Sequence, residues 1–293
     1  MGSDNSGVEL RKLAGELFGS AAKAWWLGVG LEAVAGGMAI GLNGLPLGSG
    51  ESVAGAGLVA VVAVVGYVSR VVLGEARQDL GETMRRQSVL TEGLGWDVAG
   101  WQLTEWRRMA GRKLRKRAGR VRAAPDYYAS SKPAGPERLG EMTLESCFYT
   151  RQVYLKLRAM IDGAVIVGAG AYLLTMGIAL SRTLPESVGL MISWTIYALV
   201  PVVLGADLIG WELRLRRRAG AMFEVERGLE HASKGSGKVR ESEILRLVAE
   251  YNCQVADGVP IPNLVFGWWH DEIRELWEER SGGVPGSKPV SGT

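Results

Sequence analysis

Four long apolar runs alternate with charged stretches along this 293-residue chain. They cover residues 25–46, 52–74, 163–180 and 187–211, and the third run contains no charged residue. A helix needs about 20 apolar residues to cross the hydrocarbon core of a bilayer, which is about 30 Å thick. Because four runs approach this length, the pattern favours four transmembrane helices over the buried helices of a soluble α-protein.

Short loops join these runs in pairs. Residues 43–51 and 181–186 are rich in Gly, Pro, Ser or Asn, which form turns and do not extend a helix. The predicted fold class is therefore all-α, with four transmembrane helices in two hairpins and helical cytoplasmic extensions. Both hairpins enter the membrane from the same side, which excludes an inverted repeat.

Basic residues predict the orientation of both hairpins. The two short loops contain one basic residue between them, Arg182, whereas residues 75–160 contain 17 Lys and Arg against 10 Asp and Glu. Cytoplasmic segments next to membrane helices carry the excess of Lys and Arg. We therefore expect a multi-pass membrane protein with both termini in the cytoplasm.

The polar stretches divide the chain further. The expected segments are an N-terminal amphipathic helix (1–24), the first hairpin (25–74), a basic helical cytoplasmic region (75–160), the second hairpin (161–211), a C-terminal cytoplasmic helical region (212–280) and a disordered tail (281–293). Apolar spacing and turn residues predict cytoplasmic helices over residues 75–122, from about 137 into the third apolar run, over 241–252 and over 268–280.

Overall composition changes this picture little. A formal charge of +3 is too small to indicate a nucleic-acid binder. Cys147 and Cys253 both lie in segments expected in the cytosol, so we expect no disulfide. Many of the 41 glycines lie inside the apolar runs. Gly37 and Gly41 form a small-xxx-small pair that either packs helices together or adds flexibility.

A search for catalytic motifs finds little. The chain has no G-x-x-x-x-G-K-[ST] phosphate loop and no G-x-S-x-G nucleophile elbow. His231 and His270 lack a second ligand three or four residues away that would make a metal-binding helix face. Glu141 and Glu145 are four residues apart, a spacing more typical of a solvated helix face. We therefore expect no enzymatic activity, no catalytic residue, no metal and no cofactor.

Two residues inside the apolar runs are candidates to line a pore. Glu32 is a carboxylate about seven residues into the first run, where a charge is unfavourable unless it faces water or a partner. It either lines a pore, pairs with Arg70 at the end of the second run, or reaches the lipid headgroups. Pro201 would kink the fourth helix, either as a gating hinge or as a static bend.

A dense basic run follows the second apolar run. Residues 112–122 contain seven basic side chains: Arg112, Lys113, Arg115, Lys116, Arg117, Arg120 and Arg122. Basic segments beside membrane helices usually contact anionic lipid, at about 1 kcal/mol per residue near the surface. The alternative is a pocket for an anionic signal such as a nucleotide.

Three short segments, taken in order, resemble a known family. They are Asp126-Tyr-Tyr-Ala-Ser130, Glu145-Ser-Cys-Phe-Tyr-Thr-Arg-Gln152, and Val259-Pro-Ile-Pro-Asn263 before the last charged helix. Together with two hairpins they are similar to the SMODS-associated four-transmembrane effectors, pore-forming proteins of bacteria. The resemblance covers about residues 1–280.

The resemblance implies an effector of an antiphage system in the bacterial inner membrane. A cyclic-oligonucleotide synthase of the cGAS-like class would sense infection, and the effector would then permeabilise the membrane. The implied partners are the lipid bilayer, further copies of the chain, and a cyclic oligonucleotide signal or its nucleotidyltransferase, with no nucleic acid. The motif residues Tyr127, Tyr128, Arg151 and Gln152 either bind the nucleotide or pack cytoplasmic helices together.

The sequence is also compatible with two other functions. A small transporter or channel subunit would need polar groups at mid-membrane, and Glu32 and Asn43 are the available ones. A non-conducting membrane anchor would instead use its cytoplasmic helices to recruit a partner. Four helices are too few for a wide channel in one chain, so a pore implies an oligomer.

Overall fold

The computed structural model describes residues 3–43, 49–121, 127–180, 208–234, 240–256 and 263–281. Every regular element in these ranges is helical, which confirms the all-α prediction. The chain forms two compact units. The unit that we call the bundle unit comprises Met1–Ala22, Ala76–Tyr154 and Arg217–Thr293, and the apolar unit comprises Lys23–Glu75 and Leu155–Arg216.

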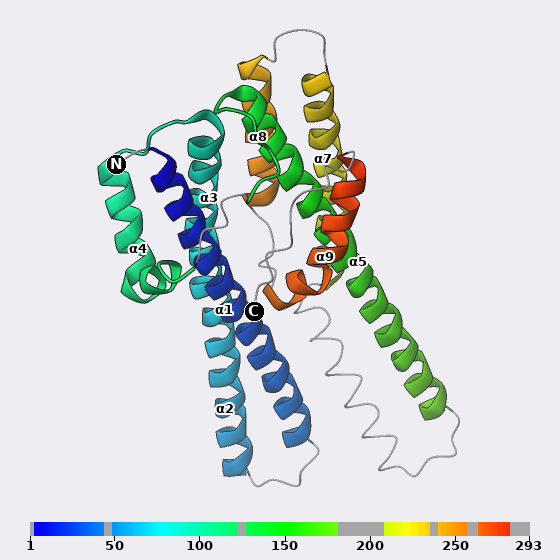
Figure 1. Cartoon of the computed structure of the whole chain (residues 1–293). Coiled ribbons are helices and arrows are strands. Elements are labelled where there is room, and N and C mark those ends of the chain that lie inside the picture. Colours follow the sequence, from blue (N-terminus) through cyan, green and yellow to red (C-terminus); the bar gives the residue numbers. More distant parts are fainter. Residues whose placement is uncertain are drawn as a thin grey trace. The chain divides into compact units, whose positions relative to one another are not determined.

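Within the described ranges, seven helices contribute residues to the bundle unit. They are α1 (Ser3–Asn43), α3 (Ala76–Leu94), α4 (Gly100–Ala118), α5 (Pro136–Leu180), α7 (Leu208–Lys234), α8 (Glu241–Ala256) and α9 (Asn263–Arg280), shown in Figure 1. The helix expected from about residue 137 is confirmed as α5, and the one expected over 241–252 as α8. The last helix begins at Asn263, five residues before its predicted start. The predicted tail lies outside the described residues beyond Ser281.

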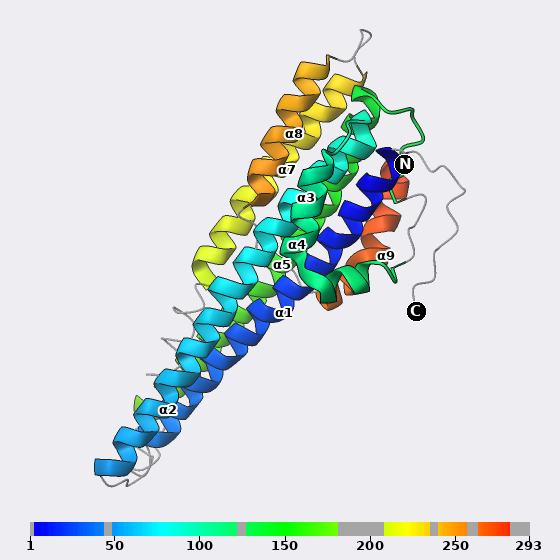
Figure 2. The same cartoon turned by 90° about the vertical axis from the view of Figure 1, so that its left-hand side faces the viewer.

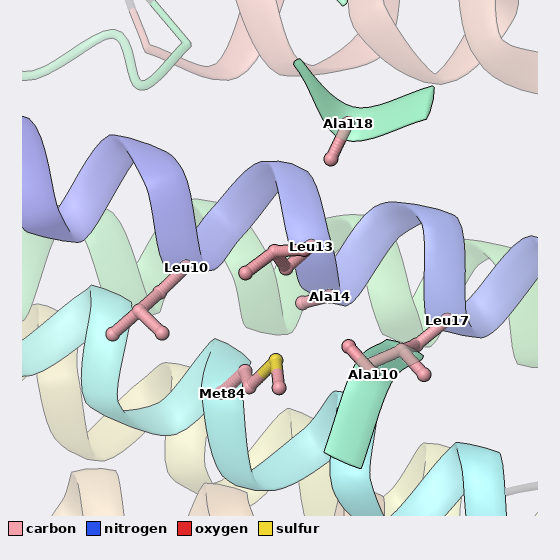
Figure 3. Packing of buried hydrophobic residues seen from close by; sticks show 7 residues of the cluster. All are labelled: Leu10, Leu13, Ala14, Leu17, Met84, Ala110 and Ala118. Carbon is pink, nitrogen blue, oxygen red and sulfur yellow. The ribbon is translucent and has the colours of Figure 1, made fainter. Parts of the chain in front are cut away.

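An apolar stripe on α1 forms part of the core of the bundle unit. Leu10, Leu13 and Leu17 are at most 1% exposed, and Figure 3 shows them with Met84 of α3 and Ala110 of α4. The spacing of three and four residues places these leucines on one face of the helix. Burying each such side chain contributes about 1.5–3 kcal/mol. The amphipathic pattern of the first 24 residues therefore serves intramolecular packing.

The helix predicted over residues 75–122 is broken in two places, which corrects that expectation. Gly95 has φ of +75°, and its N–H donates to the carbonyl of Thr91 at 2.9 Å, which ends α3. Gly111 has φ of +77° and introduces a kink inside α4. Glycine adopts this left-handed region readily, whereas other residues do so at a cost in free energy. The polar periodicity alone did not reveal either break.

The apolar unit contains a close helix pair. Figures 1 and 2 show the end of α1 beside α2 (Ser49–Val68), which continues as a seven-residue π-helix, Ser69–Glu75. The backbones approach at two glycines, because a Cβ on Gly28 would lie 2.5 Å from the carbonyl oxygen of Gly66. The small-residue contact therefore forms at Gly28 and Gly66. A Cβ on Gly37 would have no neighbour within 4 Å among the described residues.

One helix in the described part of the chain is long and apolar enough to cross a membrane. It is the continuous helix Val53–Leu94, and 11% of its most apolar stretch is buried within the chain. Such low burial is unlike that of a core helix in a soluble protein. Residues 25–43 of the first predicted span lie in α1, and the third span lies in α5. Residues 44–46 of the first span and 187–207 of the fourth lie outside the described ranges.

Candidate functional site

Glu32 lies beside Arg70 in the apolar unit. Nη2 of Arg70 is 3.3 Å from Oε1 of Glu32, and the two side chains are 22% and 27% exposed. Arg70 belongs to the π-helix, whose first residue, Ser69, donates its hydroxyl to the carbonyl of Ala24 at 2.9 Å. Within this chain the carboxylate therefore has a cationic partner, which confirms the ion-pair alternative. Pro201, the other pore-lining candidate, lies outside the described residues.

We expect the substitution Glu32→Gln to destabilise the first hairpin by about 1–2 kcal/mol, because it leaves Arg70 without its counter-charge. Combining it with Arg70→Gln should recover at least about 0.5 kcal/mol, as contacting residues are energetically coupled. Thermal unfolding of the two single variants and the double variant in detergent measures this coupling. If the stability losses of the two single variants simply add in the double variant, the ion pair does not stabilise the hairpin.

The first two segments of the family resemblance meet in the bundle unit. The backbone N–H of Ala129 donates to Oε2 of Glu145 at 2.9 Å, and the hydroxyl of Ser130 donates to Glu141 at 2.6 Å. The carboxylate pair on α5 therefore holds the loop in place. Glu141 and Glu145 therefore have a local structural role, which the spacing of the two residues did not indicate. Residues 259–262 of the third segment lie outside the described ranges.

The two adjacent tyrosines lie in this loop before α5. Their rings contact edge to face, with centroids 4.9 Å apart. The guanidinium of Arg11 on α1 lies 4.3 Å from the ring centroid of Tyr127, a favourable cation–π distance. Burial raises the pKa of the Tyr128 hydroxyl. The Tyr128 hydroxyl therefore stays neutral, and the contact between Arg11 and Tyr127 helps hold the loop against α1.

Burial also raises the pKa of Glu145 to about 7, although the hydrogen bond from Ala129 opposes this shift. The folded chain then holds a proton that the unfolded chain releases above about pH 4.5. Proton binding by Glu145 therefore stabilises the folded chain fully at low pH, and this stabilisation is lost as the pH rises through 7.

We expect Glu145→Gln to be about 1–2 kcal/mol more stable than the natural chain at pH 8, with the difference vanishing near pH 4. The amide keeps an acceptor for the Ala129 N–H and has no charge to desolvate. Thermal unfolding at both pH values measures the effect, and exposed Glu243→Gln on α8 is the matched control. A constant difference between the two pH values would refute the raised pKa.

Arg151 takes part in a different cluster. Its guanidinium lies 3.2 Å from Oε2 of Glu226 on α7 and 4.6 Å from the ring centroid of Phe223. Glu226 is 1% exposed and also binds Arg280 of α9. Arg151 therefore joins three helices through one buried carboxylate. Gln152 is half-buried on α5, and in the described part of the chain no contact joins Arg151 to the two tyrosines.

A second buried ionic network was not predicted from the sequence. Arg85 of α3 donates to Glu82 at 2.9 Å and to the side-chain oxygen of Asn252 on α8 at 2.8 Å. Burial alone would lower the pKa of Arg85, but Tyr251 and Glu82 raise it above its ordinary value. The partners Arg85 and Asn252 are 167 residues apart in sequence, so no local motif signals their contact.

Both cysteines are free thiols. Cys147 is buried and Cys253 is exposed. Burial raises the pKa of the Cys147 thiol, which keeps it protonated and unreactive. In the described ranges no three His, Cys, Asp or Glu side chains gather as metal ligands.

The basic run lies at the end of α4. Its described members, Arg112, Lys113, Arg115, Lys116, Arg117 and Arg120, are all exposed, and Arg122 lies outside the described residues. Comparison with protein-family models, curated proteins and solved structures finds no match for this chain. The family resemblance therefore stays a prediction that rests on the three short segments.

Proposed function

We propose that this chain is a pore-forming effector that spans the bacterial inner membrane four times and opens as a homo-oligomer. The observation that carries the proposal is the exposed apolar surface of the apolar unit. Val53, Val61 and Val64 on α2 are 74%, 59% and 60% exposed, and Ile166 and Val167 on α5 are 71% and 72% exposed. Continuous apolar surface of this kind is unfavourable in water and is typical of a helix facing lipid.

The proposed topology places both termini and the bundle unit in the cytoplasm. The basic excess between the second and third apolar runs supports this orientation. A cysteine replacing Gly48 should be labelled from the periplasm by a membrane-impermeant maleimide, and one replacing Ser131 should not. Both variants need Cys253→Ser, since Cys253 is exposed while Cys147 is buried. Labelling with the opposite pattern would refute the orientation.

Activity would come from membrane permeabilisation without an enzymatic step. The buried ionic networks of the bundle unit support a regulatory role for it, because such networks hold helices in a defined arrangement. The resemblance supplies the biological context, which is antiphage defence triggered by a cyclic oligonucleotide or by its nucleotidyltransferase. The bilayer and further copies of this chain are the other proposed partners.

Membrane potential in bacterial cells tests this proposal. We expect rapid depolarisation when the chain is expressed together with an active cyclic-oligonucleotide synthase of the cGAS-like class, and none with a catalytically inactive synthase. In planar bilayers, Glu32→Gln should change cation preference only if this carboxylate also faces the pore of the oligomer. If the membrane potential stays intact when the active synthase is present, the pore is refuted. The chain would then be a transporter or a non-conducting anchor.

A further inference from the structure

One cavity of the bundle unit has a distinctly basic lining. Its volume is about 720 Å³, and α1, α3 and α4 all contribute to its wall. Small-molecule sites typically enclose about 300–1,000 Å³. The charged side chains that line the cavity are Arg77 of α3 and Arg112, Lys113 and Arg117 of α4, with the hydroxyl residue Ser20 of α1 beside them. No carboxylate from the described residues lines it.

The kink in α4 belongs to the wall of this cavity. Gly111, with φ of +77°, lies between Ala110 and Arg112, and all three residues line the space. Ala110 belongs to the hydrophobic core together with Leu17 of α1 (Figure 3). The apolar residues before the kink therefore pack on α1, while the basic residues after it border the same cavity.

The cavity cations differ from Arg11, Arg107 and Arg108 of the bundle unit, which have acidic partners. Arg11 pairs with Glu92 at 3.2 Å, Arg107 with Glu9, and Arg108 with Glu105. Within the described ranges, the four cavity cations form no comparable ion pair. Like charges that converge without counter-charges repel one another and raise the local positive potential. An anion in the cavity would relieve this repulsion.

We propose that this cavity binds a phosphate-bearing anion, either a lipid headgroup or a free phosphorylated ligand. Guanidinium groups bind phosphate oxygens through paired N–H donors, and a lysine adds a point charge. The inference deepens the proposed function and rests on it in one respect. Arg77 lies on the continuous helix Val53–Leu94, so ligand binding would act directly on the helix that contains the apolar span.

Binding of inorganic tripolyphosphate to the full-length protein in phosphatidylcholine nanodiscs tests the site. We expect saturable binding that weakens at least about tenfold in the double variant Arg112→Gln, Lys113→Gln. The matched control is Arg115→Gln, Lys116→Gln, which removes the same charge from the same run outside the cavity and should change affinity less than about twofold. Arg77→Gln, distant in sequence, should also weaken binding severalfold.

Equal losses of tripolyphosphate affinity in the two double variants would overturn the proposal. They would indicate that the ligand responds to the overall positive charge of the basic run and not to the cavity. Absence of saturable binding to the natural chain would overturn it as well. Far-ultraviolet circular dichroism and Tm confirm that each variant is folded before its affinity is compared.

Native mass spectrometry distinguishes the two ligand sources. If the headgroup of an anionic lipid occupies the cavity, phosphatidylglycerol should remain bound to the natural chain and to the control variant, but not to the cavity variant. Equal lipid retention by all three, with tripolyphosphate binding still lost in the cavity variant, indicates a soluble ligand. Since binding is measured without ion flux, a chain that binds but never depolarises cells counts against the pore and not against the cavity.

Discussion

Replacing Glu226 with glutamine is expected to destabilise the bundle unit by about 3–5 kcal/mol, which corresponds to a fall in Tm of roughly 10 °C. Glu226 is 1% exposed and binds Arg151 of α5 and Arg280 of α9. Among the described residues, the substitution leaves Arg151 without a carboxylate partner and leaves Arg280 with Glu230 alone. Breaking a buried ion pair on one side costs more than the pair itself contributes.

Glu224→Gln is the matched control for this prediction. Glu224 is exposed and lies two residues earlier on the same helix, so its substitution should change stability by less than about 0.5 kcal/mol. Thermal unfolding measures both variants, and limited proteolysis reports whether α9 separates. The aromatic contact between Phe148 and Trp277, with centroids 5.3 Å apart, joins α5 to α9 and should be lost if α9 separates. Equal stability of the two variants would show that the cluster contributes little.

Introducing a side chain at Gly28 is expected to separate the first hairpin. A Cβ there would lie 2.5 Å from the carbonyl oxygen of Gly66 and 2.7 Å from Cβ of Arg70, so the helix backbones must move apart. Gly28→Ala should therefore cost about 2–3 kcal/mol, and Gly28→Leu more. The ion pair between Glu32 and Arg70 should weaken at the same time, because it depends on the same close approach.

Gly30→Ala provides the contrast on the same helix. A Cβ on Gly30 would meet no described atom within 4 Å, and alanine favours a helix by up to about 1 kcal/mol. Thermal unfolding in detergent measures both substitutions. Equal effects at the two positions would mean that the contact at Gly28 is not required for stability.

The candidate sites were only partly predictable from the sequence. Glu32 was recognisable because a charge inside an apolar run is exceptional, and its pairing with Arg70 was one of the alternatives that followed. Glu226 gave no such signal, since it lies in a stretch that already contains Glu224 and Arg227. Its burial depends on partners 75 and 54 residues away in sequence. Local sequence patterns do not indicate contacts between residues so far apart in the sequence.

The sequence by itself determined which stretches are helical and which are apolar, because both properties repeat locally with the helical period. It did not determine where helices break, since Gly95 and Gly111 look like ordinary glycines until their positive φ values are seen. Only the tertiary structure decided that the hairpin contact uses Gly28 and Gly66, and that some cations are paired while others line a cavity. These choices depend on the approach of segments distant in sequence, which is set by the packing of the whole chain.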